Sequence, residues 1–220
     1  MSFNNKHWIL GLICLSLNFS AVAQGDAEIG KLKTMGCMGC HGPTGNSFLP
    51  NFPALAGQPA GYIVKQIQDF KAANRYNATM SGFALGINDA DLEHIGAFYA
   101  SQIKTPIMKN IAHLKTEAEK TALLTLGKKL YDHGNADTGQ AACFVCHGKN
   151  GDALVDLDVP ILANQHPQYL ISTLKEFKNR KRTNDNERVM RRIVDTMSAE
   201  EIEAVAYYSS YLVPTLEEKK

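Results

Sequence analysis

The sequence lacks an excess of charge of either sign, since its 220 residues contain 23 Lys and Arg against 22 Asp and Glu. This balance argues against nucleic acid as a general partner, because such proteins need a basic surface for the phosphates. After the first 23 residues the sequence also lacks an apolar run long enough to cross a bilayer. Strand-like alternation is scarce, so we expect an all-α protein.

The first 23 residues have the pattern of an export signal. Lys6 precedes an almost unbroken apolar run at residues 8–17, and Ala21-Val22-Ala23 is a small-x-small cleavage site. We expect cleavage after Ala23, which would also remove Cys14 and leave a formally neutral chain. The alternative is an uncleaved anchor. The signal predicts the periplasm as the location of the mature protein.

The four cysteines that remain lie in two copies of the pattern Cys-x-x-Cys-His. The copies are Cys37-Met38-Gly39-Cys40-His41 and Cys143-Phe144-Val145-Cys146-His147. Two cysteines three positions apart lie on the same side of a helical turn, so both can form thioethers to one haem. The next residue, histidine, is then placed to bind the iron. The doubled pattern predicts two covalent haem c groups, held by Cys37, Cys40, His41, Cys143, Cys146 and His147.

Three other uses of paired cysteines fit less well. A four-cysteine zinc ribbon places its pairs about 15–20 residues apart, whereas about a hundred residues separate them here. A thioredoxin-like dithiol lies beside a βαβ pattern, which is not visible in this sequence. Structural disulfides stay open for an exported protein, but they give no reason for His41 and His147.

The mature sequence is an internal repeat, which predicts two domains. Matched residues of the two copies are 106 positions apart at the motifs. One extra residue in the second copy raises this distance to 107, and three more raise it to 110. At 107, segment 51–58 falls on 158–165, and the further matches are Tyr62 with Tyr169, Phe70 with Phe177, Arg75 with Arg182 and Asn77 with Asn184. We expect domains at 24–104 and 116–220, a linker at 105–115 and the leader at 1–23. Periodicity and capping residues predict helices at 27–34, 62–72, 89–101, 117–131, 169–177 and 199–212.

A haem iron bound by one histidine has a sixth position, which methionine fills in electron-transfer haems. Ile87 of the first half matches Met197 of the second in the repeat. Met80 lies seven residues before Ile87, and Met190 lies seven residues before Met197. We therefore assign Met80 and Met190 as iron ligands and place Met197 in the core. The alternative is that either ligand is a flexible core filler. Four histidines without a counterpart in the other half are expected to be solvated or to cap helices: His94, His113, His133 and His166.

The order of these features resembles a class I cytochrome c domain: attachment motif, proline-containing loop, helix, methionine loop and a last helix with aromatic residues. Two such domains in tandem, with segment 51–58, Arg182-Thr183-Asn184-Asp185 and Met80-Ser81-Gly82, resemble the cytochrome c4 family. The resemblance implies His/Met ligation in both domains and haems that face each other across a pseudo-twofold interface. It also implies that the Pro53 and Pro160 carbonyls accept the histidine N–H groups.

The family role implied by this resemblance is electron shuttling in the periplasm. We expect a carrier without catalytic residues, reduced by a quinol-oxidising complex or another donor and reoxidised by a terminal oxidase. We expect a monomer, and loose association with the membrane is compatible with the sequence. Two alternatives are an electron-transfer subunit of an oxidoreductase and a dihaem peroxidase, which needs an open iron position. Residues 175–192 have a basic excess of five, which suits a partner-docking patch, contacts to haem propionates or a solvated helix end.

Overall fold

The computed structural model describes residues 25–107, 116–153 and 159–214. The regular elements in these ranges are all helices, apart from an isolated antiparallel bridge between Asn135 and Gln140, so the all-α expectation is confirmed. The first half contains α1 (Ala27–Lys33), η1 (Met35–Cys37), α2 (Met38–His41), α3 (Ala60–Lys71), α4 (Ala78–Leu85), η2 (Asp89–Asp91) and α5 (Leu92–Ser101). The second half contains α6 (Glu117–His133), α7 (Phe144–His147), α8 (Pro167–Lys178), η3 (Asn186–Arg188), α9 (Val189–Asp195) and α10 (Ala199–Tyr211).

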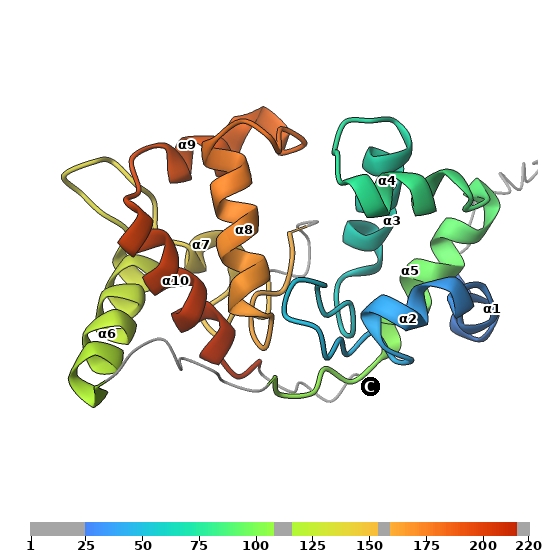
Figure 1. The fold of residues 1–220 in the computed structure, drawn as a ribbon, viewed down its shortest axis with the longest axis horizontal. Helices are drawn as coiled ribbons and strands as arrows, with labels where there is room; N and C mark the ends of the chain where they lie inside the picture. Colours follow the sequence, from blue (N-terminus) through green and yellow to red (C-terminus); the bar gives the residue numbers. More distant parts are fainter. Residues whose placement is uncertain (1–24, 108–115, 154–158, 215–220) are drawn as a thin grey trace, which may run out of the picture.

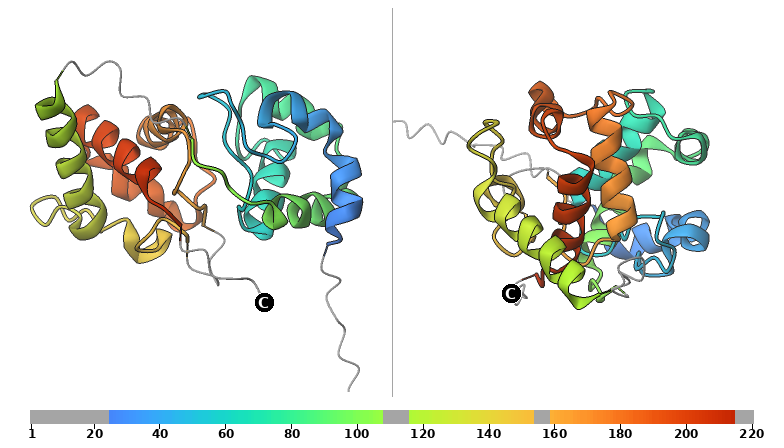
Figure 2. Two further views of the ribbon diagram at one scale, coloured as in Figure 1. Left: turned by 90° about the horizontal axis from the view of Figure 1, so that it is seen from below. Right: turned by 60° about the vertical axis from the view of Figure 1, so that its left-hand side comes forward.

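The two halves lie side by side along the longest axis of the molecule, with α3 and α8 towards the middle (Figures 1 and 2). In each half the first helix packs against the last, α1 on α5 and α6 on α10. The central helix of each half packs on the same last helix, α3 on α5 and α8 on α10. The repeat in the sequence therefore corresponds to a repeat in the architecture.

A glycine lies at the crossing of the first and last helix in each half. A Cβ on Gly30 would lie 1.9 Å from the His94 carbonyl oxygen, and a Cβ on Gly127 would lie 2.2 Å from that of Ala204. Only a residue without a side chain permits such close backbone approach. The two glycines therefore fix the same helix crossing in both halves.

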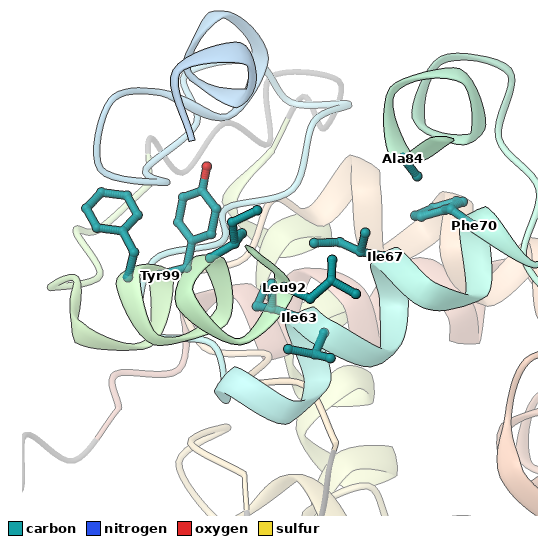
Figure 3. Close-up of a cluster of buried hydrophobic side chains, with 9 residues drawn as sticks. Ile63, Ile67, Phe70, Ala84, Leu92 and Tyr99 are labelled. Carbon is teal, nitrogen blue, oxygen red and sulfur yellow. The ribbon is translucent and has the colours of Figure 1, made fainter. Parts of the chain in front are cut away.

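Each half has its own apolar core. In the first half, buried side chains of α3 and α5 meet, as Figure 3 shows for Ile63, Ile67, Leu92 and Tyr99. Cys37 of the first Cys-x-x-Cys-His motif packs against this cluster. In the second half, α6, α8, α9 and α10 supply the corresponding cluster, which includes Met197 at 2% exposure. Met197 is thus a core residue, as expected.

The predicted helices agree with the structure to within two residues at each end when η2 is counted with α5, and two caps are confirmed. Asn88 accepts a bond from the Ala90 N–H, and Ser198 forms a capping box with Glu201. None of the helices in the described ranges is long and apolar enough to span a membrane. The leader and residues 108–115 of the linker lie outside the described residues, so the domain boundaries stay predictions.

Candidate functional site

Each Cys-x-x-Cys-His motif ends in one turn of helix that directs its histidine inward. The glycine after each motif, Gly42 or Gly148, has φ +79°, a conformation that favours glycine and ends the helix. A Cβ on Gly42 would lie 2.5 Å from the Asn46 carbonyl oxygen. The chain therefore turns back at this point, and His41 and His147 are both buried.

The two histidines have the same hydrogen bond. Nδ1 of His41 lies 2.9 Å from the Pro53 carbonyl oxygen, and Nδ1 of His147 lies 3.0 Å from that of Pro160. A carbonyl only accepts, so each Nδ1 carries the proton and each Nε2 has a free lone pair. Burial lowers the pKa of both rings, although the bond to the proline carbonyl opposes this shift. Both imidazoles are thus held neutral in the state that binds iron, and the bonds implied by the resemblance are present.

The four motif cysteines are half-buried and form no disulfide. Burial raises the pKa of the Cys143 thiol to about 12 and also raises that of Cys37. Among the described residues, no three His, Cys, Asp or Glu side chains cluster as a metal site, so the zinc alternative finds no support there. All four thiols remain available for thioether bonds.

Met80 and Met190 lie on short helices rather than in loops, which corrects the expectation of methionine loops. Met80 is in α4, where its N–H and that of Thr79 donate to the side chain of Asn77. Met190 is in α9, and both methionines are half-buried against the core of their half. These helices were not predicted, because each is only about two turns long and shows no clear helical periodicity of apolar residues.

A cavity of about 1380 Å³ is lined by both halves. His41 and Met80 line it from the first half, and His147 and Met190 line it from the second. Cys37, Cys143 and Cys146 also belong to its wall, whereas Cys40 is half-buried on the same turn as His41. Nε2 of His41 is buried without a hydrogen-bond partner in the described structure. A buried lone pair without a donor costs free energy unless it has a ligand, so these residues fit a haem iron.

A polar cluster that the sequence analysis did not assign lies where the halves meet. Oε1 of the buried Gln66 side chain accepts from Arg75 at 2.9 Å and from Arg182 of the other half at 3.0 Å. Arg75 also donates to the Tyr169 hydroxyl at 3.1 Å. Burial raises the pKa of Tyr169, but the two guanidinium groups outweigh it and lower the pKa to about 8. Both arginines line the cavity, so they are placed to attract haem propionates.

The basic stretch at 175–192 is not one uniform exposed patch. Arg180 forms a two-pronged ion pair with Asp195, and Lys178 donates to the carbonyl oxygens of Asp195, at the end of α9, and of Met197 beyond it. Arg182 is buried in the interdomain cluster. Lys175 and Lys181 are exposed, so part of the stretch still presents positive charge to solvent.

Of the three remaining histidines that lie in the described ranges, two form hydrogen bonds within the protein. His94 accepts from the Asp26 N–H at the start of α1, which is the expected capping role. His166 is buried at 7% exposure, and its Nε2 lies 2.9 Å from the Ser47 carbonyl oxygen of the other half. The expectation of a solvated or capping side chain was wrong for His166, because the interface between the halves covers it. His133 is exposed as expected, and His113 lies outside the described residues.

Comparison with known proteins agrees with this geometry. The family described as Cytochrome c matches residues 27–102 and again 124–211. Cytochrome c4 of Thiocapsa roseopersicina is 40% identical over 84% of this chain and 91% of its own length. The chain belongs to the cytochrome c4 family. The crystal structure of reduced recombinant cytochrome c4 from Pseudomonas stutzeri has a TM-score of 0.78 at 36% identity, covering 86% of this chain and 100% of that chain.

A further relative has another name. A thiosulfate dehydrogenase electron acceptor of Stutzerimonas stutzeri (strain A1501) is 31% identical over 92% of this chain and 93% of its own length. Membership of the cytochrome c4 family identifies the chain as a dihaem electron-transfer cytochrome with two covalent haem c groups. The prediction of two haems is therefore confirmed, while the roles of individual site residues stay predictions.

Proposed function

We propose that both irons are six-coordinate, with His41 and Met80 as ligands in the first half and His147 and Met190 in the second. The observation that carries this proposal is the recurrence of the same pair on the wall of one cavity. When bound, each haem supplies a one-electron couple. The chain's own residues orient the ligands, bury the site and leave no iron position open for a substrate.

With both positions filled, the protein serves as a carrier in the periplasm. It takes electrons from a quinol-oxidising complex and passes them to a terminal oxidase. Both proposed ligand pairs line the same cavity between the halves, which supports this role. An electron can then enter at one haem and leave from the other. Contacts with partners in such an exchange are small and short-lived, and any steering by the exposed lysines weakens as salt rises.

Stopped-flow mixing with each candidate partner tests this role. Fast reduction of both haems by the quinol-oxidising complex, followed by fast reoxidation by the terminal oxidase, is expected. Slow exchange with both complexes, at any ionic strength, would contradict the proposed partners. Peroxidase turnover by the isolated protein would contradict the carrier role itself.

A second candidate is an electron acceptor for an oxidoreductase. The relative named as a thiosulfate dehydrogenase electron acceptor favours it. Mixing with thiosulfate dehydrogenase and thiosulfate distinguishes the two, since reduction much faster than by the quinol-oxidising complex would select the oxidoreductase. Co-elution of the two proteins at native concentration would indicate a permanent subunit.

The proposed location depends on the leader. Amino-terminal sequencing of the mature protein is expected to begin at Gln24, and fractionation is expected to place it in the periplasm as a monomer. Recovery with the membranes at low salt and release at high salt would indicate peripheral association. An uncleaved amino terminus would contradict the leader assignment.

A further inference from the structure

Two buried glutamines join the halves through reciprocal bonds. Oε1 of Gln165 accepts from the Ala54 N–H at 2.8 Å, while its Nε2 donates to the Ala54 carbonyl at 2.9 Å. Gln58 of the first half makes the same pair of bonds to Ile161, at 2.9 and 2.8 Å. Gln58 and Gln165 are 2% and 3% exposed. The donor and acceptor on each partner residue fix both amide orientations.

Each glutamine bonds the peptide unit that holds the axial histidine of the opposite half. The Ala54 N–H belongs to the same peptide group as the Pro53 carbonyl, which accepts from His41. In the other half, the Ile161 N–H shares its peptide group with the Pro160 carbonyl, which accepts from His147. A hydrogen-bond chain therefore runs from each histidine through one peptide to a glutamine of the other half.

Such a chain has an electronic consequence. A hydrogen bond from the peptide N–H to a glutamine oxygen polarises the peptide and makes its carbonyl a stronger acceptor. A stronger acceptor at Nδ1 raises the basicity of the histidine as a ligand. A more basic ligand stabilises ferric iron, which lowers the reduction potential of that haem.

We propose that Gln58 and Gln165 are crossed positioning residues: each sets the orientation and basicity of the axial histidine in the opposite half. Gln165 acts on His41 through the Pro53–Ala54 peptide, and Gln58 acts on His147 through the Pro160–Ile161 peptide. Separation of the halves then changes both potentials, so domain contact is part of each haem's environment. This inference rests on the ligand assignment in the proposed function.

Single substitutions in the full-length dihaem protein test the crossing. Gln165→Leu keeps the side-chain size but removes both bonds to Ala54. The midpoint potential of the haem in the first half is expected to rise, while the other midpoint stays. Gln58→Leu is expected to shift the haem of the second half alone. In Gln165→Asn and Gln58→Asn the side chain is too short for its amide to reach Ala54 or Ile161. These variants should give the same shifts in midpoint potential, and they replace a leucine variant that fails to fold.

Nuclear magnetic resonance assigns each haem to its half. Haem methyl groups near Ile95 belong to the first half and those near Val205 to the second, because these side chains line the cavity from the two sides. The methyl shift pattern of the oxidised protein reports the plane of the axial histidine. It should change in the same haem whose midpoint moves.

His166→Leu is the matched control. It removes another bond between the halves, to Ser47, next to Gln165 but outside the histidine–peptide chain. The proposal predicts unchanged midpoints for this variant. Equal shifts from His166→Leu, shifts in the glutamine's own half, or no shift with intact His/Met spectra would each overturn the crossed roles. A wild-type spectrum without His/Met ligation would instead overturn the proposed function on which they rest.

Discussion

The two halves hold their histidines alike but their methionines differently. On the histidine side, each half uses a proline carbonyl at about 3 Å and a glycine that ends the motif helix. On the methionine side, Asn77 caps α4 and bonds the Met80 N–H. Its counterpart Asn184 instead donates to Gln66 and Asp69 of the first half.

Three additional residues in the second half accompany this difference. They precede α9, where Glu187 and Arg188 have positive φ and Asp185 bonds the backbone and side chain of Arg191. With Asn184 committed to the interface, Asp185 and Arg191 hold the start of the Met190 segment. The comparison shows that the histidine side tolerates little change between the copies, whereas the methionine can be held by different local structures.

The largest expected effect comes from the helix crossings that both halves share. Gly127→Ala and Gly30→Ala place a Cβ about 2 Å from a backbone oxygen. We expect each to lower the free energy of unfolding by about 3 kcal/mol or more, because backbone has to move. Denaturant unfolding followed by circular dichroism measures this loss. Gly86→Ala, whose Cβ would lie 3.5 Å from its nearest neighbour, is the control; an equal loss there would contradict the steric account.

The next prediction concerns ligation. Met80→Ala and Met190→Ala are each expected to lower the potential of one haem and open that iron alone to carbon monoxide. Redox titration and carbon monoxide difference spectra measure both effects. Met197→Ala is expected to cost about 2–5 kcal/mol of stability without changing ligation, since Met197 is a core residue. If Met197→Ala loses the methionine signature while Met190→Ala keeps it, the assignment in the second half is wrong.

The smallest effect separates the two ways of holding methionine. Asn77→Ala removes the cap of α4 and is expected to cost about 1 kcal/mol. It should speed carbon monoxide uptake by the first haem, because Met80 leaves its position more often. Asn184→Ala should instead weaken contact between the halves, with little effect on uptake by the second haem. Laser-flash and stopped-flow binding compare the two; equal effects on ligand uptake would remove the distinction.

The motifs, the repeat and most helices were predictable because their signals are local. Cysteine spacing, apolar periodicity and capping residues such as Ser198 act within a few turns of chain. The bonds of Gln58 and Gln165 were not predictable, because they join residues more than a hundred positions apart. The one sequence signal for them is that the same polar residue, glutamine, occupies matched positions of the two copies. The same holds for Arg75 and Arg182. His166 had no such signal, since Pro59 occupies its place in the first copy.

Exposure of the reduced wild-type protein to carbon monoxide tests the central claim most directly. If His41 and Met80 bind one iron and His147 and Met190 the other, neither haem has an open position. The absorption spectrum of the reduced protein should then remain unchanged over the time in which Met80→Ala binds one carbon monoxide per protein. Uptake of one or two equivalents by the wild type, at the rate of that variant, would contradict the account.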